Sequence, residues 1–263
     1  MHMRNGLIIL FTIVCVAVAF LWPAMPQPLS YHAFVDQREF FGVPNFLDVA
    51  SNIGFVIPGV WGLYITMRPR TVFATDIERV PYVVFFLGML LTSIGSSYYH
   101  LAPDNERLFW DRLPMTIAFM SLIASQINER ISVRLGSLLL VPMLIVGAAS
   151  VFYWRATERA GAGNVIPYGI LQGYSVVILL LIALLLPSRY TRGRDIYWVF
   201  AWYVIAKLLE AIDAYIYAAG NLVSGHTLKH LAAGAAGVVV CFMLARRELT
   251  SEHDTTRPGS RYT

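Results

Sequence analysis

Apolar runs of about 20 residues, the length a helix needs to cross a bilayer core, alternate with short polar segments along this chain. We interpret these runs as transmembrane helices, which predicts an all-α, polytopic membrane helix bundle. The start of the fourth helix is open, because Asp104 could cap a helix from Asn105 or Trp110 could be the first embedded residue. The eight predicted helices lie near residues 6–22, 46–66, 80–100, 108–128, 135–154, 165–187, 196–218 and 226–245.

The first helix is open to two interpretations. A basic start followed by Ala-Val-Ala at 17–19 fits a cleavable signal peptide, but the run stays apolar to Trp22, which favours an uncleaved anchor. The predicted organisation is an N-terminal transmembrane anchor at 1–23, a membrane domain at 24–247 and a polar tail at 248–263.

Composition supports the membrane assignment. Hydrophobic residues make up 57% of the 263 residues and charged residues 14%, whereas soluble domains carry about 25% charged residues. Cys15 and Cys241 both lie inside apolar runs, so neither a disulfide framework nor a cysteine zinc site is expected.

The basic residues predict the orientation of the helices. If the helices alternate in direction, loops on the side of the N-terminus carry 13 of the 20 Lys and Arg residues, and the opposite loops carry four. By the positive-inside rule, both termini are expected in the cytoplasm.

In this orientation, polar side chains from five helices gather in the outer half of the membrane, and the inner half is nearly free of them. Ionisable residues inside a membrane are costly, so their convergence indicates a functional site near the extracytoplasmic face. The outer-half residues are Asn45, Asp48, Asn52, Ser96, His100, Asp111, Glu210, Asp213, His226 and His230.

Three of these residues could bind zinc. His226 and His230 are four residues apart and share a helix face, and His100 lies at the same depth. Three imidazoles leave a fourth zinc position for water, whose pKa zinc lowers to about 7. Asp111 could move the proton of that water or orient a ligand, and Ser96 could donate to an oxyanion, which is the chemistry of amide or ester hydrolysis.

Taken singly, each feature also has a structural interpretation. One His-x3-His pair is equally compatible with packing, haem ligation or a hydrogen-bond network. Ser96 could serve helix packing, and Asp111 could pair with a neighbouring arginine. Lys229 could extend to the headgroups, and Glu210 and Asp213 could pair with Lys207.

The combined pattern is more specific. Ser96-x3-His100, then Trp110-Asp111, then His226-x3-His230 on the last helix resembles the CREST superfamily of seven-helix membrane hydrolases, and its alkaline ceramidase branch most of all. The stretch Asn-Phe-Leu-Asp-Val-Ala-Ser-Asn at 45–52 is similar to that family's first-helix signature. The resemblance covers roughly residues 30–245, so the first predicted helix is an addition to a seven-helix core.

The resemblance implies zinc bound by His100, His226 and His230, with Ser96 and Asp111 assisting catalysis. It further implies hydrolysis of a ceramide-like lipid amide to a fatty acid and a sphingoid-type base. The expected substrate is therefore a membrane lipid. No nucleic acid partner is expected, and no obligate protein partner is evident.

Two departures from the family limit what is expected. Only Asp36 and Glu39 resemble the family's acidic calcium element, and Asn45 occupies a position where an acidic residue is expected. Calcium binding is therefore doubtful. Asp48 and Asn52 are candidates either for calcium binding or for polar support of the site. Lys229 occupies a position where the family usually has an aromatic residue, so the resemblance does not identify the headgroup of the substrate.

Glu210, Asp213 and Lys229 are candidates for the substrate pocket. The alternatives for function are an ester or acyl-remodelling lipid hydrolase and a receptor-like protein whose zinc site is not catalytic. A carrier is disfavoured, because it would need ionisable residues through the whole depth of the membrane.

Overall fold

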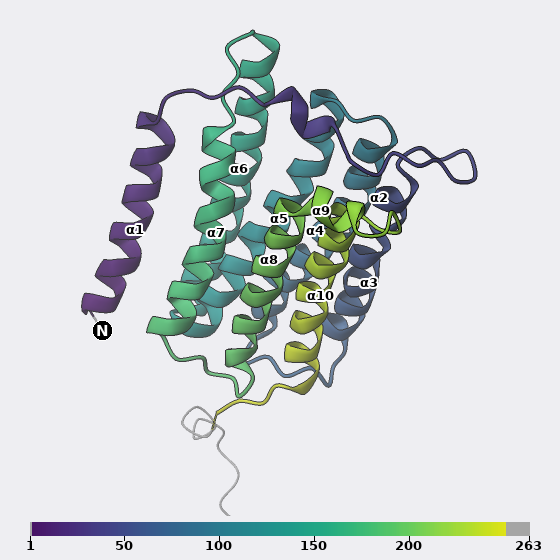
Figure 1. The fold of residues 1–263 in the computed structure, drawn as a ribbon. Coiled ribbons are helices and arrows are strands. Elements are labelled where there is room, and N and C mark those ends of the chain that lie inside the picture. Colours follow the sequence, from purple (N-terminus) through teal and green to yellow (C-terminus); the bar gives the residue numbers. More distant parts are fainter. Residues whose placement is uncertain (1, 251–263) are drawn as a thin grey trace, which may run out of the picture.

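The computed structural model describes residues 2–250, which form a bundle of roughly parallel helices (Figure 1) and contain no β-strand beyond two isolated bridges. The predicted all-α fold is confirmed. The helices are α1 (His2–Leu21), α2 (Phe46–Ala50), α3 (Ile53–Met67), α4 (Arg79–Leu101), α5 (Asn105–Arg130), α6 (Val133–Arg159), α7 (Ile166–Leu185), α8 (Ile196–Ala211), α9 (Asp213–Ala218) and α10 (Gly225–Arg246).

Six helical segments among the described residues are long and apolar enough to cross a membrane, as expected of a multi-pass membrane protein. They are α1, α2 with α3, α4, α6, α7 and α10. Two further predicted spans, α5 and α8, fall outside this set because α5 is comparatively polar and α8 has only 16 residues. Both still run alongside the other helices of the bundle (Figure 1).

Two predicted continuous helices are interrupted. The helix predicted at 46–66 breaks at residues 51–52, because the Ser51 hydroxyl and the Asn52 amide donate to the carbonyl oxygen of Asp48 and compete with the helical pattern. The helix predicted at 196–218 breaks at Ile212, between α8 and α9. Of the two possible starts of the fourth predicted helix, the structure has the earlier one, at Asn105. The Asp104 side chain accepts a hydrogen bond from the Arg107 N–H at 2.7 Å and caps α5.

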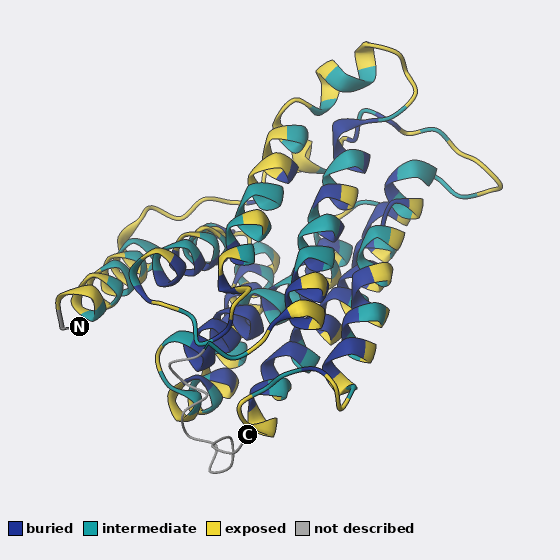
Figure 2. Ribbon diagram, turned by 90° about the horizontal axis from the view of Figure 1, so that it is seen from below, coloured by how far each residue is buried: buried dark blue, intermediate teal, exposed yellow. Residues whose placement is uncertain are grey.

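Helix α1 lies at the edge of the bundle beside α7, and its residues stay largely uncovered (Figure 2). Two polar contacts join it to α7: the hydroxyls of Thr12 and Tyr174 are 3.2 Å apart, and the Arg4 guanidinium donates to the Leu185 carbonyl oxygen at 3.1 Å. The Phe11 ring stacks on Tyr174. Helix α1 is therefore peripheral to the bundle of α3 to α8 and α10.

Charged side chains are also buried at the end of the bundle where α1 begins and α10 finishes. Glu78, Glu129 and Arg247 are all buried there, although the sequence pattern places them outside the predicted membrane helices. Glu129 pairs with Arg247 and accepts from Tyr82, and Glu78 accepts from Tyr190. All three residues lie at or next to the ends of helices, where the sequence pattern predicts loops. In the structure their side chains pack against the end of the bundle.

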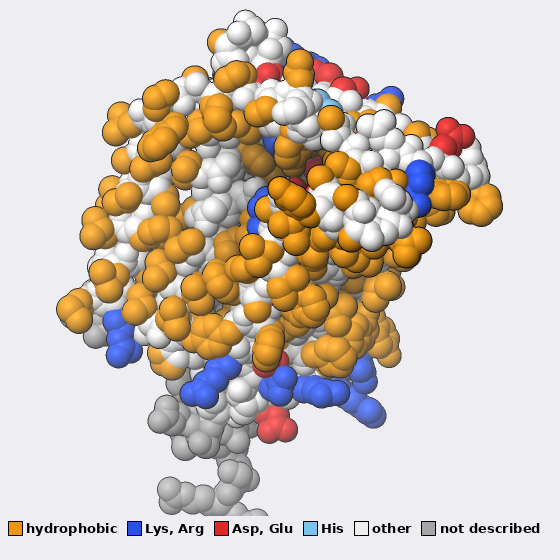
Figure 3. Space-filling view, viewed as in Figure 1, with side chains coloured by type: hydrophobic (Ala, Val, Ile, Leu, Met, Phe, Trp, Pro, Cys, Tyr) orange, Lys and Arg blue, Asp and Glu red, His pale blue; other side chains and the backbone are white. Residues whose placement is uncertain are grey.

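Apolar side chains cover the wall of the molecule seen in Figure 3, and Lys and Arg side chains gather at its lower end. This is the end at which α1 begins and α10 finishes (Figure 1). A belt of apolar surface with charges beyond it is the surface expected of a helix bundle in a bilayer.

Helices α4 and α5 approach each other very closely near the end of α4 and the start of α5. A Cβ on Gly95 would lie 1.9 Å from the carbonyl oxygen of Trp110, so only glycine fits. This contact fixes the spacing between the end of α4 and the start of α5, the two elements that carry His100 and Asp111.

We predict that Gly95→Ala costs about 1–3 kcal/mol of stability, the usual effect of overpacking. Gly173→Ala is the matched control, because nothing lies within 4 Å of its Cβ position on α7. Thermal melting of the purified variants in detergent checks both. Equal melting temperatures for the two variants would contradict the assigned close approach.

Candidate metal centre

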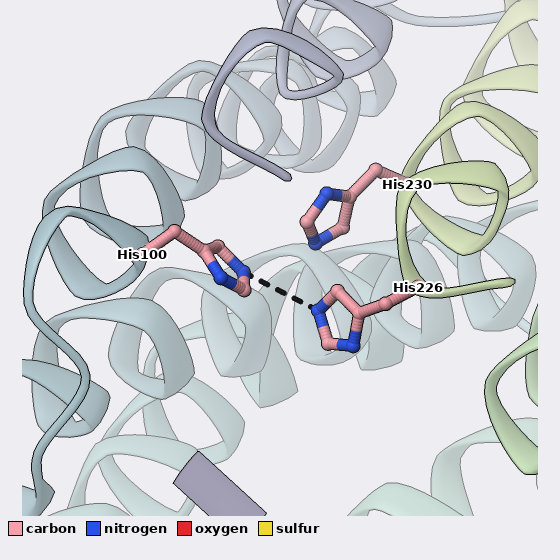
Figure 4. Close-up of side chains that lie close together, drawn as sticks. All are labelled: His100, His226 and His230. Carbon is pink, nitrogen blue, oxygen red and sulfur yellow. Dashed lines mark hydrogen bonds between the residues drawn. The ribbon is translucent and has the colours of Figure 1, made fainter. Parts of the chain in front are cut away.

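Three histidines from two helices meet at the end of the bundle where α4 finishes and α10 begins. His100 lies in the last turn of α4, and His226 and His230 lie in the first two turns of α10. All three side chains are buried, with exposed fractions of 1%, 6% and 3%. Figure 4 shows the rings pointing toward a common centre.

The geometry of the three rings fits a metal ion. One nitrogen from each histidine lies within 4.8 Å of the others, and the Nε2 atoms of His100 and His226 are 3.3 Å apart. A tetrahedral ion with metal–nitrogen bonds of about 2.0–2.1 Å requires nitrogen separations of about 3.3–3.4 Å. Within residues 2–250, this is the one group of three His, Cys, Asp or Glu side chains placed to hold a metal.

Ser51 selects the tautomer of His230. Its hydroxyl oxygen is 2.8 Å from His230 Nδ1 and 3.1 Å from the carbonyl oxygen of Asp48. Because the single hydroxyl hydrogen points to that carbonyl, the oxygen accepts from Nδ1–H. The lone pair of His230 is therefore on Nε2, the atom available to a metal.

The predicted stripe of Asn45, Asp48 and Asn52 is buried and holds the helices that carry the histidines. The Asn45 amide donates to the His100 carbonyl oxygen at 2.8 Å. One Asp48 carboxylate oxygen accepts from Thr227 at 2.7 Å and from Ser224, the residue that caps α10. Asn45 and Asp48 therefore position the helices that carry the histidines, whereas the Asn52 amide donates to the carbonyl oxygens of Asp48 and Val49 in its own segment.

The predicted pocket residues separate into two roles. Glu210 and Lys229 line a cavity beside the histidines, and the Lys229 Nζ atom lies 3.1 Å from Glu210 and 2.9 Å from His226 Nε2. Lys229 thus turns inward and does not extend to the headgroups. Asp213 does not line the cavity, and its carboxylate accepts from the backbone N–H of His226 at 2.8 Å.

The cavity has a volume of about 390 Å³ and opens in the hollow visible in Figure 3. Its polar end includes Ser96, Asp111 and His230, and its other walls are mainly apolar side chains of α4, α5, α7, α8 and α10. The two residues predicted to be catalytic, on α4 and α5, therefore line the same cavity as His230.

Asp111 is free of the arginine pairing that the sequence left open. Among the described residues, Arg107 pairs instead with Asp104, and the Arg112 guanidinium donates to Gln27. The Asp111 carboxylate lies close enough to the Ser96 hydroxyl to interact with it.

Asp36 and Glu39, the two residues that resemble the family's calcium element, lie in different environments. Both carboxylate oxygens of Asp36 accept hydrogen bonds from Arg38, at 2.8 and 2.7 Å, which hold the Asp36 pKa below its usual value. Glu39 is exposed. Arg38 also donates to the carbonyl oxygens of Asn221 and Leu222, so this element fastens the 24–44 connection to the loop before α10.

Three residues near the centre have roles that the sequence pattern did not predict. In the sequence, Ser51 is part of the 45–52 stretch, but nothing there indicates that it contacts a histidine. Phe34 packs its ring 4.6 Å from that of His100 and 4.7 Å from that of His226, measured between centroids. His32 bonds to Tyr99 and Asn105. Nothing in the spacing of the 24–44 connection points to Phe34 or His32.

Neither protein-family models nor curated proteins give a match to this chain. The site is therefore interpreted from its own geometry.

We predict that Ser51→Ala weakens zinc binding about 10–100-fold, the usual effect of losing a partner that orients a ligand. Ser175→Ala is the control, because that buried hydroxyl bonds only to its own helix at Leu171. Competition of the purified variants against a zinc chelator measures the affinity. His230→Ala should lose the ion, and full zinc affinity in Ser51→Ala would contradict the tautomer assignment.

Proposed function

We propose that this chain is a zinc-dependent intramembrane hydrolase of lipid amides, a ceramide-like N-acyl lipid being the substrate class. The observation that carries the proposal is the placement of Ser96, Asp111 and His230 at the polar end of one mainly apolar cavity. We further propose that it is related to the alkaline ceramidases, on the motifs at 96–111 and 226–230.

Zinc suits the site because three neutral imidazoles are the ligands of known catalytic zinc centres, which keep one position open. When bound, zinc supplies a Lewis acid and lowers the pKa of water to about 7. The chain's own part is to orient His230 through Ser51 and to keep the three ligands buried together.

Asp111 is placed to move protons. It lines the cavity and has no arginine partner among the described residues, so its carboxylate can take a proton from the attacking water and return it to the leaving nitrogen. Ser96 faces it from α4 and can donate to the carbonyl oxygen as that oxygen gains charge.

The rest of the cavity suits an acyl chain. Its walls include the apolar side chains of Phe85, Met89, Leu122, Leu179 and Ala236. Met89 and Phe85 lie 11 and 15 residues before His100 on α4, and Ala236 lies six residues after His230 on α10, so the apolar lining continues away from the histidines along these helices. An acyl chain lying along these residues would leave its carbonyl at the polar end, where the proposed catalytic groups are. An apolar lining with few polar groups is typical of lipid sites.

We predict that Asp111→Asn lowers hydrolysis by roughly 10²–10⁴-fold per bound zinc, the usual contribution of a positioned acid–base group. Fatty-acid release from N-acyl and O-acyl lipids, normalised to measured zinc, is the test. Asp76→Asn is the control, because Asp76 is exposed and pairs with Arg79 at the inner end.

Unchanged turnover per zinc in Asp111→Asn would remove Asp111 from the mechanism. Release from O-acyl lipids alone would replace the amide hydrolase with an ester hydrolase. Bound zinc with no release from any lipid would indicate the receptor-like alternative.

A further inference from the structure

Arg112 lines the same cavity one residue after Asp111, and its side chain is nearly buried, with an exposed fraction of 5%. Its guanidinium carbon lies 4.4 Å from the ring centroid of Trp154 and 4.7 Å from that of Tyr168. Tyr31 covers it at 5.5 Å. The aromatic rings hold the guanidinium group in one place beside the polar end of the cavity.

The hydrogen-bonding capacity of Arg112 is only partly used. One terminal nitrogen donates to the Gln27 side-chain oxygen at 2.6 Å, and the other is buried without a partner. Within residues 2–250 no carboxylate pairs with Arg112, and the nearby Glu158 instead accepts from the backbone of Gln27. A buried cation without an anion is costly, and more so inside a membrane.

The charged side chains that line the cavity carry one excess positive charge. Lys207 and Lys229 share Glu210 as their ion-pair partner, and Asp111 has the proton-transfer role proposed above. Among the described residues of the lining, Arg112 is the cation that forms no ion pair, since Asp111 acts on it only at longer range, and one of its terminal nitrogens has no hydrogen-bond partner. The planar arrangement of N–H donors on its guanidinium group matches the oxygens of a carboxylate or a phosphate.

We propose that Arg112 binds an anionic oxygen, of a carboxylate or phosphate, on the headgroup of the acyl lipid in this cavity. The inference rests on the proposed function, because the same cavity takes the acyl chain. Arg112 lies under Gln27 and Tyr31 of the outer connection, on the side where a headgroup would lie. The preferred substrates are then N-acyl lipids with an acidic headgroup.

Binding of ligands that cannot be hydrolysed tests this separately from catalysis. The matched pair is 2-(oleyloxy)acetate and 2-(oleyloxy)ethanol, which share an ether-linked chain and differ in one carboxylate. Oleate is the third probe and represents a released fatty acid. Competition binding is measured on the full chain in phosphatidylcholine nanodiscs at constant pH.

The wild type should prefer the carboxylate ether over the alcohol by about 10–100-fold, as expected for a hydrogen bond to a charged group. Arg112→Gln should bring the two affinities close together. Gln27→Glu should also bring the two affinities close together with little change of side-chain shape, because the new carboxylate would pair with Arg112 in place of the ligand's carboxylate. Arg155→Gln is the control, since Arg155 stacks on Phe109 and pairs with Glu106 away from the cavity.

Equal wild-type affinities for the two ethers, or a preference that survives both Arg112→Gln and Gln27→Glu, would overturn the proposal. An equal loss of oleate affinity in Arg112→Gln would reassign Arg112 to the fatty-acid product. Failure of both ethers to bind would refute the acyl-lipid cavity itself. If the wild type prefers the carboxylate ether and this preference depends on Arg112, but no lipid is hydrolysed, anion binding by Arg112 would be supported and the proposed hydrolase function would be refuted.

Discussion

A bilayer core offers no water to a polar side chain, so a buried polar group depends on partners within the protein. That constraint organises the end of the bundle that holds the three histidines. Asp48 accepts a hydrogen bond from the Thr227 hydroxyl, the Asn45 amide donates to the His100 carbonyl oxygen at the end of α4, and the Ser51 hydroxyl oxygen accepts from His230. These contacts join α2, α4 and α10, and the three histidines meet where they join.

Much of this arrangement follows from the sequence. Apolar runs of membrane-spanning length predict the helix bundle, and spacing of four residues predicts that Ser96 with His100, and His226 with His230, each share a face. Helices that start and end at the outer side must bring those faces to one depth. The convergence of His100, His226 and His230 could therefore be predicted before the structure was known.

The remaining features depend on tertiary contacts that periodicity does not encode. The break after Ala50 arises because the side chains of Ser51 and Asn52 compete for a backbone carbonyl, and that break turns Ser51 toward His230. Phe34 reaches the histidines from a connection with no periodic pattern. Arg112 looks in sequence like a partner for Asp111, whereas the fold surrounds it with aromatic rings.

The central claim is that the three buried histidines form a metal centre. X-ray absorption at the zinc edge of the purified wild-type protein tests it most directly, since it reports ligand type and distance together. We predict three imidazole nitrogens at about 2.0–2.1 Å from the zinc ion and one further light ligand. Zinc held by fewer than two imidazoles, or protein that takes up no zinc when it is supplied, would contradict it.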